Sequence, residues 1–411
     1  MATFTDPVHD EFASWFLGLA PYGGADVGEI DALVPLVKDG DDGSFYEACA
    51  ATATARIAEG DSAAKSGHLE SAYDCYLRAA LFLAVGIHPL YGTPVDPRLR
   101  DGFHLGMATF EKALRLGVVR AEPVDIPYES TKIPAWFLRA PGHEDERRAC
   151  ILVGGGWDST MIENFLGMGA AALRRGYHVL LHDGPGQGSL LVDEGLTLRH
   201  DWEQVVTPVV DAALGIDVVD PDQLVYEPWS LGGFMAPRVA AYEHRLAAVI
   251  ADPGQMDVGG KITGPLQMRG LDAAAIAKLP ELSASDEKAI MDFFDGNRPL
   301  HWKIVQRGFW TNRGGDLSGF IAEMMKWKLT PEEIAGITTP MLVTAAQSDP
   351  VSSDSKALYD ALPGPKTFLQ FTDAEGAGMH CEILNRSMAN RRILDWVDDT
   401  LATVRSAQTS G

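Results

Sequence analysis

The first part of the chain, residues 1–117, carries apolar residues at helical spacing. Residues 62–86 keep apolar and small side chains three and four positions apart across a glycine, and residues 103–117 repeat this spacing up to Gly117. The alanine and tyrosine pattern of the first segment resembles one helix pair of a tetratricopeptide array, but such an array needs about three stacked units. No convincing third unit follows, so the pattern predicts a plain helical domain.

The spacing changes after Gly117 from helical to strand-like. Residues 118–130 and 132–141 have the pattern of the two strands of a hairpin. Six short runs with apolar centres follow, and helical segments separate most of them. These runs occupy residues 149–154, 177–182, 222–230, 246–254, 340–350 and 366–374. Apolar strands that alternate with helices are typical of a parallel sheet covered on both faces, so the pattern predicts an α/β fold.

One connection between predicted strands is much longer than the others. Residues 255–335 show helical patterning, and structureless loops of that length are rare, so we expect an inserted helical cap. The sheet domain would then comprise residues 118–254 and 336–411. The cap is rich in aromatic residues and methionine, namely Phe293, Phe294, Trp302, Phe309, Trp310, Met324, Met325 and Trp327. We expect these side chains mainly to form the core of the cap; the alternative is that some line an apolar pocket above the sheet.

The stretch VYEPWSLGGFMAP, residues 225–237, places a serine between a predicted strand and a predicted helix. It differs from the G-x-S-x-G nucleophile elbow because Pro228 stands where the first glycine belongs. Such a turn needs small neighbours, and Gly232 and Gly233 supply them on the helix side. We interpret Ser230 as a candidate nucleophile; the alternative is a serine that caps the following helix.

A serine nucleophile needs a base beside it and a third group that orients this base. His380 lies in a glycine-rich loop between the last predicted strand and the C-terminal helix, which favours it over the other histidines. Asp349 follows the preceding strand, so the order serine, acid, histidine is that of the α/β hydrolases. Asp252 is the rival acid, with loop hydrogen bonding as its simpler role, and Asp354 fits the first turn of the next helix.

The loop GGGWDST, residues 154–160, follows the first buried strand. Its glycines allow the backbone to approach a reacting carbonyl, so we expect this loop to supply one donor of an oxyanion hole. We assign that donor to the N–H of Trp157, beside Gly156, and the second donor to the N–H of Leu231, the residue after the candidate nucleophile. The simpler alternative is a triple glycine that only makes a tight turn. Asp183, in the loop after the next strand, is expected to be structural.

Composition limits the classes of partner. The chain has 411 residues and a formal net charge of −23, which repels phosphate backbones, so nucleic acids and anionic membrane surfaces are not expected partners. The four cysteines lack metal-ligand spacing and fit a reducing cytoplasm, so we expect no metal and no cofactor. The first residues lack the features of a signal peptide, and the longest apolar run, residues 79–87, is too short to span a bilayer. A small-molecule substrate and a cytoplasmic location are expected, and a homodimer is left open.

Three motifs together resemble one group of α/β hydrolases. They are GGGWDST at residues 154–160, HDGPGQG with DWEQVVTPVVD at residues 182–211, and WSLGGFMAPR at residues 229–238. The group comprises relatives of 2,6-dihydroxypseudooxynicotine hydrolase, fungal hydrolases that shorten polyketides in pigment synthesis, and FrsA-like proteins. The resemblance runs from about residue 60 to the C-terminus, and it implies a helical N-terminal domain that packs over the active site.

The resemblance places the catalytic triad of the family on Ser230, Asp349 and His380. It places an acidic residue of the oxyanion loop, which would meet the substrate, on Asp158. Members of the family cleave a carbon–carbon bond beside a ketone in aryl or polyketide 1,3-dicarbonyl compounds, and others hydrolyse esters. The sequence departs from the family at the elbow, where Pro-Trp-Ser replaces Gly-Trp-Ser and Glu227 stands at a position that is usually apolar.

The tryptophans indicate the kind of substrate. Five of them belong to the expected cap or flank the candidate site: Trp302, Trp310, Trp327, Trp157 and Trp229. Aromatic walls favour a flat, largely apolar ligand, so we expect an aromatic or polyketide-like 1,3-dicarbonyl substrate in contact with Trp229, with Asp158 holding a phenol or enol hydroxyl. The alternatives are an esterase or lactonase, an acyl-transferring cyclase, and a non-catalytic ligand-binding protein.

Overall fold

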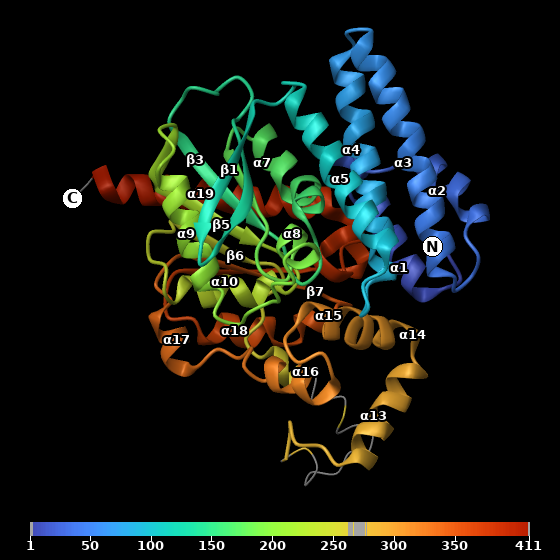
Figure 1. Cartoon of the computed structure of the whole chain (residues 1–411). Helices are drawn as coiled ribbons and strands as arrows, with labels where there is room; N and C mark the ends of the chain where they lie inside the picture. Colours follow the sequence, from blue (N-terminus) through green and yellow to red (C-terminus); the bar gives the residue numbers. More distant parts are fainter. Residues whose placement is uncertain (1–2, 262–265, 267–275, 277, 410–411) are drawn as a thin grey trace.

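The computed structural model describes residues 3–261, 266, 276 and 278–409 around a central eight-stranded sheet (Figure 1). The strand order is β1-β2-β4-β3-β5-β6-β7-β8. The β1–β2 and β2–β4 pairs are antiparallel, and all other pairs are parallel. The strands are β1 (Ala121–Tyr128), β2 (Thr131–Leu138), β3 (Arg148–Gly154), β4 (His178–His182), β5 (Val219–Pro228), β6 (Ala248–Ala251), β7 (Met341–Ala346) and β8 (Lys366–Phe371). Each lies within a few residues of its predicted position, so the predicted α/β-hydrolase fold class is confirmed.

The two faces of the sheet bury different parts of the chain. Along β3, Ile151 and Val153 point into a core shared with the N-terminal helices, whereas Cys150 and Leu152 point into a core on the opposite face. The helices of the sheet domain are α6 (Met161–Asn164), α7 (Ala170–Arg174), α8 (Gly188–Val192), α9 (Glu203–Leu214), α10 (Gly232–Ala240), α18 (Ser355–Ala361) and α19 (Arg386–Thr409). Of these, α7 and α19 pack on the first face, and α9, α10 and α18 pack on the second. Both faces are therefore covered, as a parallel sheet requires.

The N-terminal part of the chain is helical and lies against the first face of the sheet (blue to cyan in Figure 1). Its helices are α1 (Pro7–Gly18), α2 (Val27–Leu33), α3 (Asp42–Lys65), α4 (Leu69–Gly86) and α5 (Pro97–Arg115). Residues 62–86, predicted as helical across a glycine, form the end of α3 and the whole of α4, which lie side by side. Gly67 separates them with a φ of +80°, a left-handed conformation that favours glycine and ends a helix.

The described part of the cap lies below the sheet domain in Figure 1 (yellow to orange). Its elements are α13 (Ala284–Asp295), α14 (Arg298–Leu300), the π-helical η5 (His301–Gly308), α15 (Phe309–Thr311), α16 (Leu317–Met324) and α17 (Pro331–Gly336). Trp302 packs against Phe12 of α1, and Trp327 packs against Phe234 of α10. These aromatic residues therefore dock the cap on the rest of the molecule instead of forming only a core of its own. Within the described ranges, no helix is long and apolar enough to cross a lipid bilayer.

Candidate active site

Ser230 occupies a sharp turn between β5 and α10. Its φ is +60°, a left-handed conformation that costs free energy for residues other than glycine. Two hydrogen bonds hold the turn, because the Ser230 N–H donates to the Asp252 carbonyl at 2.7 Å and the Gly233 N–H donates to the Ser230 carbonyl at 2.9 Å. A strained serine between a strand and a helix is the backbone geometry of a nucleophile elbow.

Pro228 is the last residue of β5 and pairs with Gly154 of β3. A Cβ atom on Gly232 would lie 2.5 Å from the Cβ of Pro228, so this glycine makes the room that the proline needs. A Cβ atom on Gly233 would lie 1.7 Å from the Pro253 carbonyl oxygen, so the second glycine keeps α10 close to the sheet. The departure from the glycine of the elbow motif therefore leaves both the turn and the contact between helix and strand in place.

The structure brings Ser230, His380 and Asp349 together in one hydrogen-bonded chain. His380 Nε2 lies 2.9 Å from Ser230 Oγ, and His380 Nδ1 lies 2.8 Å from Asp349 Oδ2. Asp349 follows β7 and His380 follows β8, so both residues lie beyond the carboxyl ends of parallel strands, as Ser230 does. The Asp349 side chain is 1% exposed and that of His380 is 28% exposed, so the chain runs from a buried acid to an accessible histidine.

The charges in this chain suit proton transfer. Burial opposes the charged form of Asp349, but His380 and the Val351 N–H outweigh it, so the pKa of Asp349 lies below its usual value. Burial also lowers the pKa of His380, and the Asp349 carboxylate more than offsets this, so the pKa of His380 lies above its usual value. The ionised Asp349 accepts a hydrogen bond from Nδ1–H, which holds that proton on Nδ1 and leaves the lone pair of Nε2 to take a proton from Ser230 Oγ.

The two other aspartates considered from the sequence have different partners. Asp252 accepts a hydrogen bond from Thr344 and pairs with Arg386 at 2.5 Å. Asp354 accepts hydrogen bonds from two backbone N–H groups of the segment that leads into the cap, and it pairs with Lys261. Asp349 is thus the one of the three that contacts the histidine. Among the described residues, no group of three or more His, Cys, Asp or Glu side chains is arranged to hold a metal ion.

The glycine-rich loop after β3 presses against the elbow at Gly156. A Cβ atom on Gly156 would lie 2.5 Å from the Trp229 carbonyl oxygen and 2.9 Å from the Leu231 nitrogen. A side chain at this position would therefore push the loop away from the elbow. The approach brings the backbone of the loop beside Ser230, so the N–H groups of Trp157 and Leu231 are candidates for a shared oxyanion hole.

Residues outside the sheet domain also hold this loop. Tyr91, just after the N-terminal helix α4, donates from its hydroxyl to the Asp158 carbonyl at 3.2 Å. Thr311 of the cap accepts from Trp157 Nε1 at 2.7 Å, and Arg307 of the cap pairs with Asp158 Oδ2 at 3.1 Å. Both additions to the sheet domain therefore contact the residues from which an oxyanion hole would be built.

Asp158 is charged in this environment. Burial would raise the pKa of Asp158, but the positive charges of Arg307 and His88 outweigh this effect, so the pKa lies below its usual value. Its side chain is 18% exposed, and its Oδ2 is the atom that pairs with Arg307. The second oxygen, Oδ1, is suited to accept a hydrogen bond from a ligand.

The Trp229 side chain supports the site from within the core. It is 2% exposed, and its Nε1 donates to Asn164 Oδ1 at 2.8 Å. A Cβ atom on Gly167 would lie 2.4 Å from its ring, Trp15 meets it edge to face, and the Arg386 guanidinium lies 5.0 Å from its ring centre. A ring packed in this way offers no free face, so the expectation that Trp229 contacts the substrate is corrected to a supporting role.

A buried ionic cluster near the elbow was not predicted from the sequence. Arg386 is fully buried and contacts three buried carboxylates, those of Asp252 at 2.5 Å, Glu227 at 3.1 Å and Glu382 at 3.5 Å. It also donates to the Cys381 carbonyl at 3.1 Å. Cys381 and Glu382 have left-handed φ values of 51° and 50°, so the arginine stabilises a strained turn.

The Arg386 cluster joins the segments that carry Ser230 and His380. Glu227 precedes Ser230 by three residues, and Glu382 follows His380 by two. Burial raises the pKa of Glu227 to about 8 in spite of the arginine. The one signal in the sequence was the charge of Glu227 directly after the apolar residues 224–226, because a buried carboxylate needs a partner.

Comparison with known proteins identifies the family. Residues 150–391 match the profile of the alpha/beta hydrolase family. The chain belongs to the alpha/beta hydrolase family. It is 30% identical to the hydrolase LUC6 of a Fusarium species, over 95% of this chain and 95% of that protein.

Two further alpha/beta hydrolases bear on the group to which the chain is similar. The 20-hydroxy-prefusarin hydrolase FUS2 of Gibberella moniliformis is 35% identical, over 61% of this chain and 63% of that protein. The crystal structure of 2,6-dihydroxy-pseudo-oxynicotine hydrolase matches with a TM-score of 0.72 at 21% identity, over 94% of this chain and 96% of that one, which shows a shared fold. The resemblance predicted from the three motifs is thereby confirmed, and the protein is an enzyme of this hydrolase family.

Proposed function

We propose that this enzyme is a serine-dependent hydrolase that cleaves the carbon–carbon bond beside a ketone in an aromatic or polyketide-like 1,3-dicarbonyl compound. The observation that carries the proposal is the chain from Ser230 Oγ through His380 to Asp349, with Gly156 pressed against the elbow. The relative FUS2, whose name describes a hydrolase of a prefusarin compound, supports a substrate of similar size and type.

The first half of the reaction makes an acyl-enzyme. Ser230 Oγ attacks the ketone carbon while His380 Nε2 takes the hydroxyl proton, and Asp349 stabilises the imidazolium that forms. The N–H groups of Leu231 and Trp157 hold the negative oxygen of the adduct. The carbon–carbon bond then breaks, and its electron pair leaves as an enolate that the neighbouring carbonyl of the substrate stabilises. His380 returns the proton to the enolate carbon.

The second half releases the acyl group. His380, neutral again, takes a proton from water as the water oxygen attacks the ester carbonyl of the acyl-enzyme. The same two N–H groups hold the second oxyanion, and the proton from His380 returns to Ser230 Oγ as the carbon–oxygen bond breaks. The products are one ketone and one carboxylic acid, and water is the only co-substrate.

Asp158 is the proposed contact for a phenol or enol hydroxyl of the substrate. Its carboxylate is ionised, partly exposed and fixed by Arg307, so Oδ1 offers an acceptor of defined direction. The tryptophans contribute less to the proposal than expected from the sequence, because Trp157, Trp229 and Trp302 are buried in packing contacts. The substrate class therefore rests on Asp158 and on the relatives.

The proposed domain division is residues 1–117, 118–254 with 336–411, and 255–335. Contacts of Trp302 with the N-terminal helices and of Trp157 with the cap support the view that both additions cover the site. A homodimer and a cytoplasmic location remain predictions.

An ester or lactone hydrolase and an acyl-transferring cyclase are the second candidates, because the same hydrogen-bonded chain serves an oxygen leaving group or a substrate nucleophile in place of water. A ligand-binding protein without catalysis is the candidate from another class. Ser230 Oγ within 2.9 Å of His380 Nε2 favours an active nucleophile over that reading.

The experiment compares an aryl 1,3-diketone such as benzoylacetone with an aryl ester of matched size. The diketone reading predicts loss of the enol absorbance and release of one ketone and one acid, at a higher kcat/KM than for the ester. Much faster cleavage of short aliphatic esters would replace it with the esterase reading. No turnover together with no labelling of Ser230 by a fluorophosphonate would favour the binding protein.

A further inference from the structure

Arg307 of the cap lies where the cap meets the loop after β3. Its guanidinium carbon is 4.2 Å from the ring centre of Trp157 and 5.1 Å from that of Trp302, so the cation contacts two indole rings. Its Nη1 pairs with Asp158 Oδ2 at 3.1 Å. One side chain of the cap therefore holds two consecutive residues of the loop.

The cap fixes the Trp157 indole in two further ways. Phe320 of α16 stacks on it with ring centres 6.2 Å apart and planes at 17°, and Thr311 accepts a hydrogen bond from Nε1 at 2.7 Å. The whole Trp157 residue is only 9% exposed. Because the ring is held by stacking and by its polar edge, the backbone N–H of the same residue has a restricted position.

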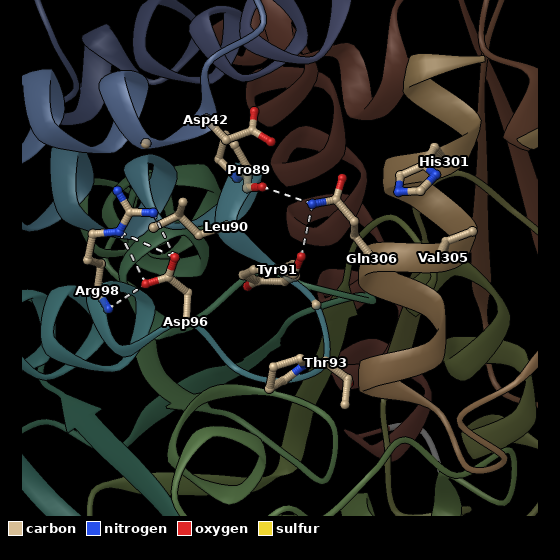
Figure 2. Close-up of a pocket in the computed structure, with 13 residues that line it drawn as sticks. Asp42, Pro89, Leu90, Tyr91, Thr93, Asp96, Arg98, His301, Val305 and Gln306 are labelled. Carbon is tan, nitrogen blue, oxygen red and sulfur yellow. Dashed lines mark hydrogen bonds and ion pairs between the residues drawn. The ribbon is translucent and has the colours of Figure 1, made fainter. Parts of the chain in front are cut away.

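The π-helical segment η5, which carries the arginine, is itself anchored on the N-terminal helices. Gln306 Nε2 donates to the carbonyls of Pro89 and Tyr91, at 3.3 and 3.1 Å, and these residues line a cavity of about 440 Å³. Figure 2 shows both hydrogen bonds. Trp302 Nε1 donates to the His88 carbonyl at 2.8 Å. The loop after β3 is therefore connected through η5 to a part of the chain outside the sheet domain.

The contact needs the chemistry of arginine. Arg307 Nε is buried without a hydrogen-bond acceptor, and the guanidinium as a whole lies over the electron-rich face of Trp157, which attracts the cation. A planar guanidinium stacks on an indole and pairs with the Asp158 carboxylate at the same time. A lysine ammonium carries the same charge, but it has no planar group that could stack on the indole ring.

We propose that Arg307 is a positioning residue for the oxyanion hole. It does not touch the reacting atoms; it fixes Trp157 and Asp158, so that the Trp157 N–H is in place while the cap is docked on the N-terminal helices. The inference rests on the proposed function, in which that N–H holds the oxyanion. A catalytic group displaced by about 1 Å costs on the order of 10²-fold in rate. Docking of the cap is thereby coupled to stabilisation of the transition state.

Three variants test this role: Arg307→Met, which keeps an unbranched apolar stem without the guanidinium, Arg307→Lys, which keeps the charge, and Arg313→Met as the control. Arg313 is an exposed arginine of the same cap. For each variant, kcat and KM are measured, together with the inhibition constant of a trifluoromethyl ketone, whose adduct with Ser230 carries the oxyanion. We expect Arg307→Met to lower kcat by about 10²-fold with KM changed by less than about threefold, Arg307→Lys to lie between it and wild type, and Arg313→Met to match wild type.

The inhibitor separates positioning from other roles. For a positioning residue, the inhibition constant rises in proportion to the fall in kcat/KM, because the adduct mimics the transition state. An unchanged kcat in Arg307→Met would overturn the inference. A raised KM with unchanged kcat and unchanged inhibition constant would overturn it as well, and would make Arg307 a group that binds substrate.

Two milder variants cover the case in which Arg307→Met does not fold. Asp158→Asn weakens the ion pair, and Thr311→Val removes the partner of Trp157 Nε1. Thr311→Val should lower kcat without a matching rise in KM. Asp158→Asn also alters the proposed substrate contact, so it should both lower kcat and raise KM, and wild-type kcat in both variants would overturn the inference. Full turnover by Ser230→Ala would contradict the proposed function itself, whereas strict dependence on Ser230 with an unaffected Arg307→Met contradicts this inference alone.

Discussion

The two halves of the candidate active site are held by different parts of the molecule. On the elbow side, Ser230 and His380 are tied to the sheet domain, where the buried Arg386 links Glu227 to Glu382. On the oxyanion-loop side, Trp157 and the following aspartate are tied to the cap and to the N-terminal helices. The elbow side is therefore held within the sheet domain, whereas the oxyanion-loop side depends on the cap and the N-terminal helices.

This difference separates stability from activity. Loss of a contact on the elbow side leaves buried carboxyl groups without their partner and destabilises the fold. Loss of a contact on the oxyanion-loop side removes a partly exposed ion pair or a stacking contact, which costs the fold little but moves a donor. A change in the cap can therefore move Trp157 and Asp158 while Ser230, Asp349 and His380 stay in place.

The largest effect on kcat is expected from the residues that carry out the attack on the substrate carbonyl. Ser230→Ala and His380→Ala should each lower kcat by about 10⁴- to 10⁶-fold, because the members of such a chain act as a unit. The unfolding temperature should stay close to that of wild type, since neither side chain lies in the apolar core. Steady-state kinetics and calorimetry check both points, and wild-type turnover by Ser230→Ala would end the assignment.

The second prediction concerns a variant that removes contacts on the elbow side alone. Arg386→Met leaves three buried carboxyl groups without the cation to which they bind, so we expect the free energy of unfolding to fall by about 3–5 kcal/mol. Chemical denaturation measures it, with Arg391→Met as the control because Arg391 is exposed on the same helix. Arg307→Met should cost far less stability than Arg386→Met, and equal losses would contradict the division between the two halves.

The third prediction moves the loop without touching the cap. Gly156→Ala adds a Cβ atom 2.5 Å from the Trp229 carbonyl oxygen, so the loop must retreat from the elbow. We expect kcat to fall by about 10²-fold, the size of a lost oxyanion donor, with the fold retained. Gly28→Ala is the matched control, since a Cβ atom there meets nothing within 4 Å. Unimpaired turnover by Gly156→Ala would show that the loop does not form the hole.

The smallest effect concerns the charges around His380. The raised pKa of His380 places the acid limb of kcat/KM above the usual histidine value of about 6.5, and the rate falls as pH falls through it, because a protonated histidine takes no proton from Ser230. Lys303 lowers the pKa of His380 and Glu11 raises it, and the two side chains pair at 3.0 Å.

Opposite shifts of the limb are therefore expected from the two partners of this pair. Lys303→Met should move the acid limb to higher pH, and Glu11→Gln should move it to lower pH. Rates measured across the limb report both shifts directly. Movement in the same direction for both variants would mean that their charges do not reach His380.

Local patterns were enough to predict the sheet and the residues of the elbow side. The parallel strands have short apolar centres, and Ser230, Asp349 and His380 each follow such a strand. The elbow was the less obvious case, because the room that Pro228 requires is supplied by a glycine four residues later, on the next turn of the chain.

The contacts made over long distances along the chain could not be predicted in this way. Arg386 lies 159 residues from Glu227, and Arg307 lies 149 residues from Asp158. Nothing in the local spacing marks either arginine, since each lies in a helix with other charged residues. Trp229 was misjudged for the same reason, because its burial depends on Gly167 and Asn164 in another helix.

The contact between Pro228 and Gly232 also restricts the order in which this sequence can change. The two Cβ positions would be 2.5 Å apart, so a proline at 228 and a side chain at 232 exclude each other. The clashing atom is the Cβ of Pro228, so any residue other than glycine at 228 meets the same limit, and a side chain fits at only one of the two positions at a time. A substitution of Gly232 therefore requires a glycine at 228 first.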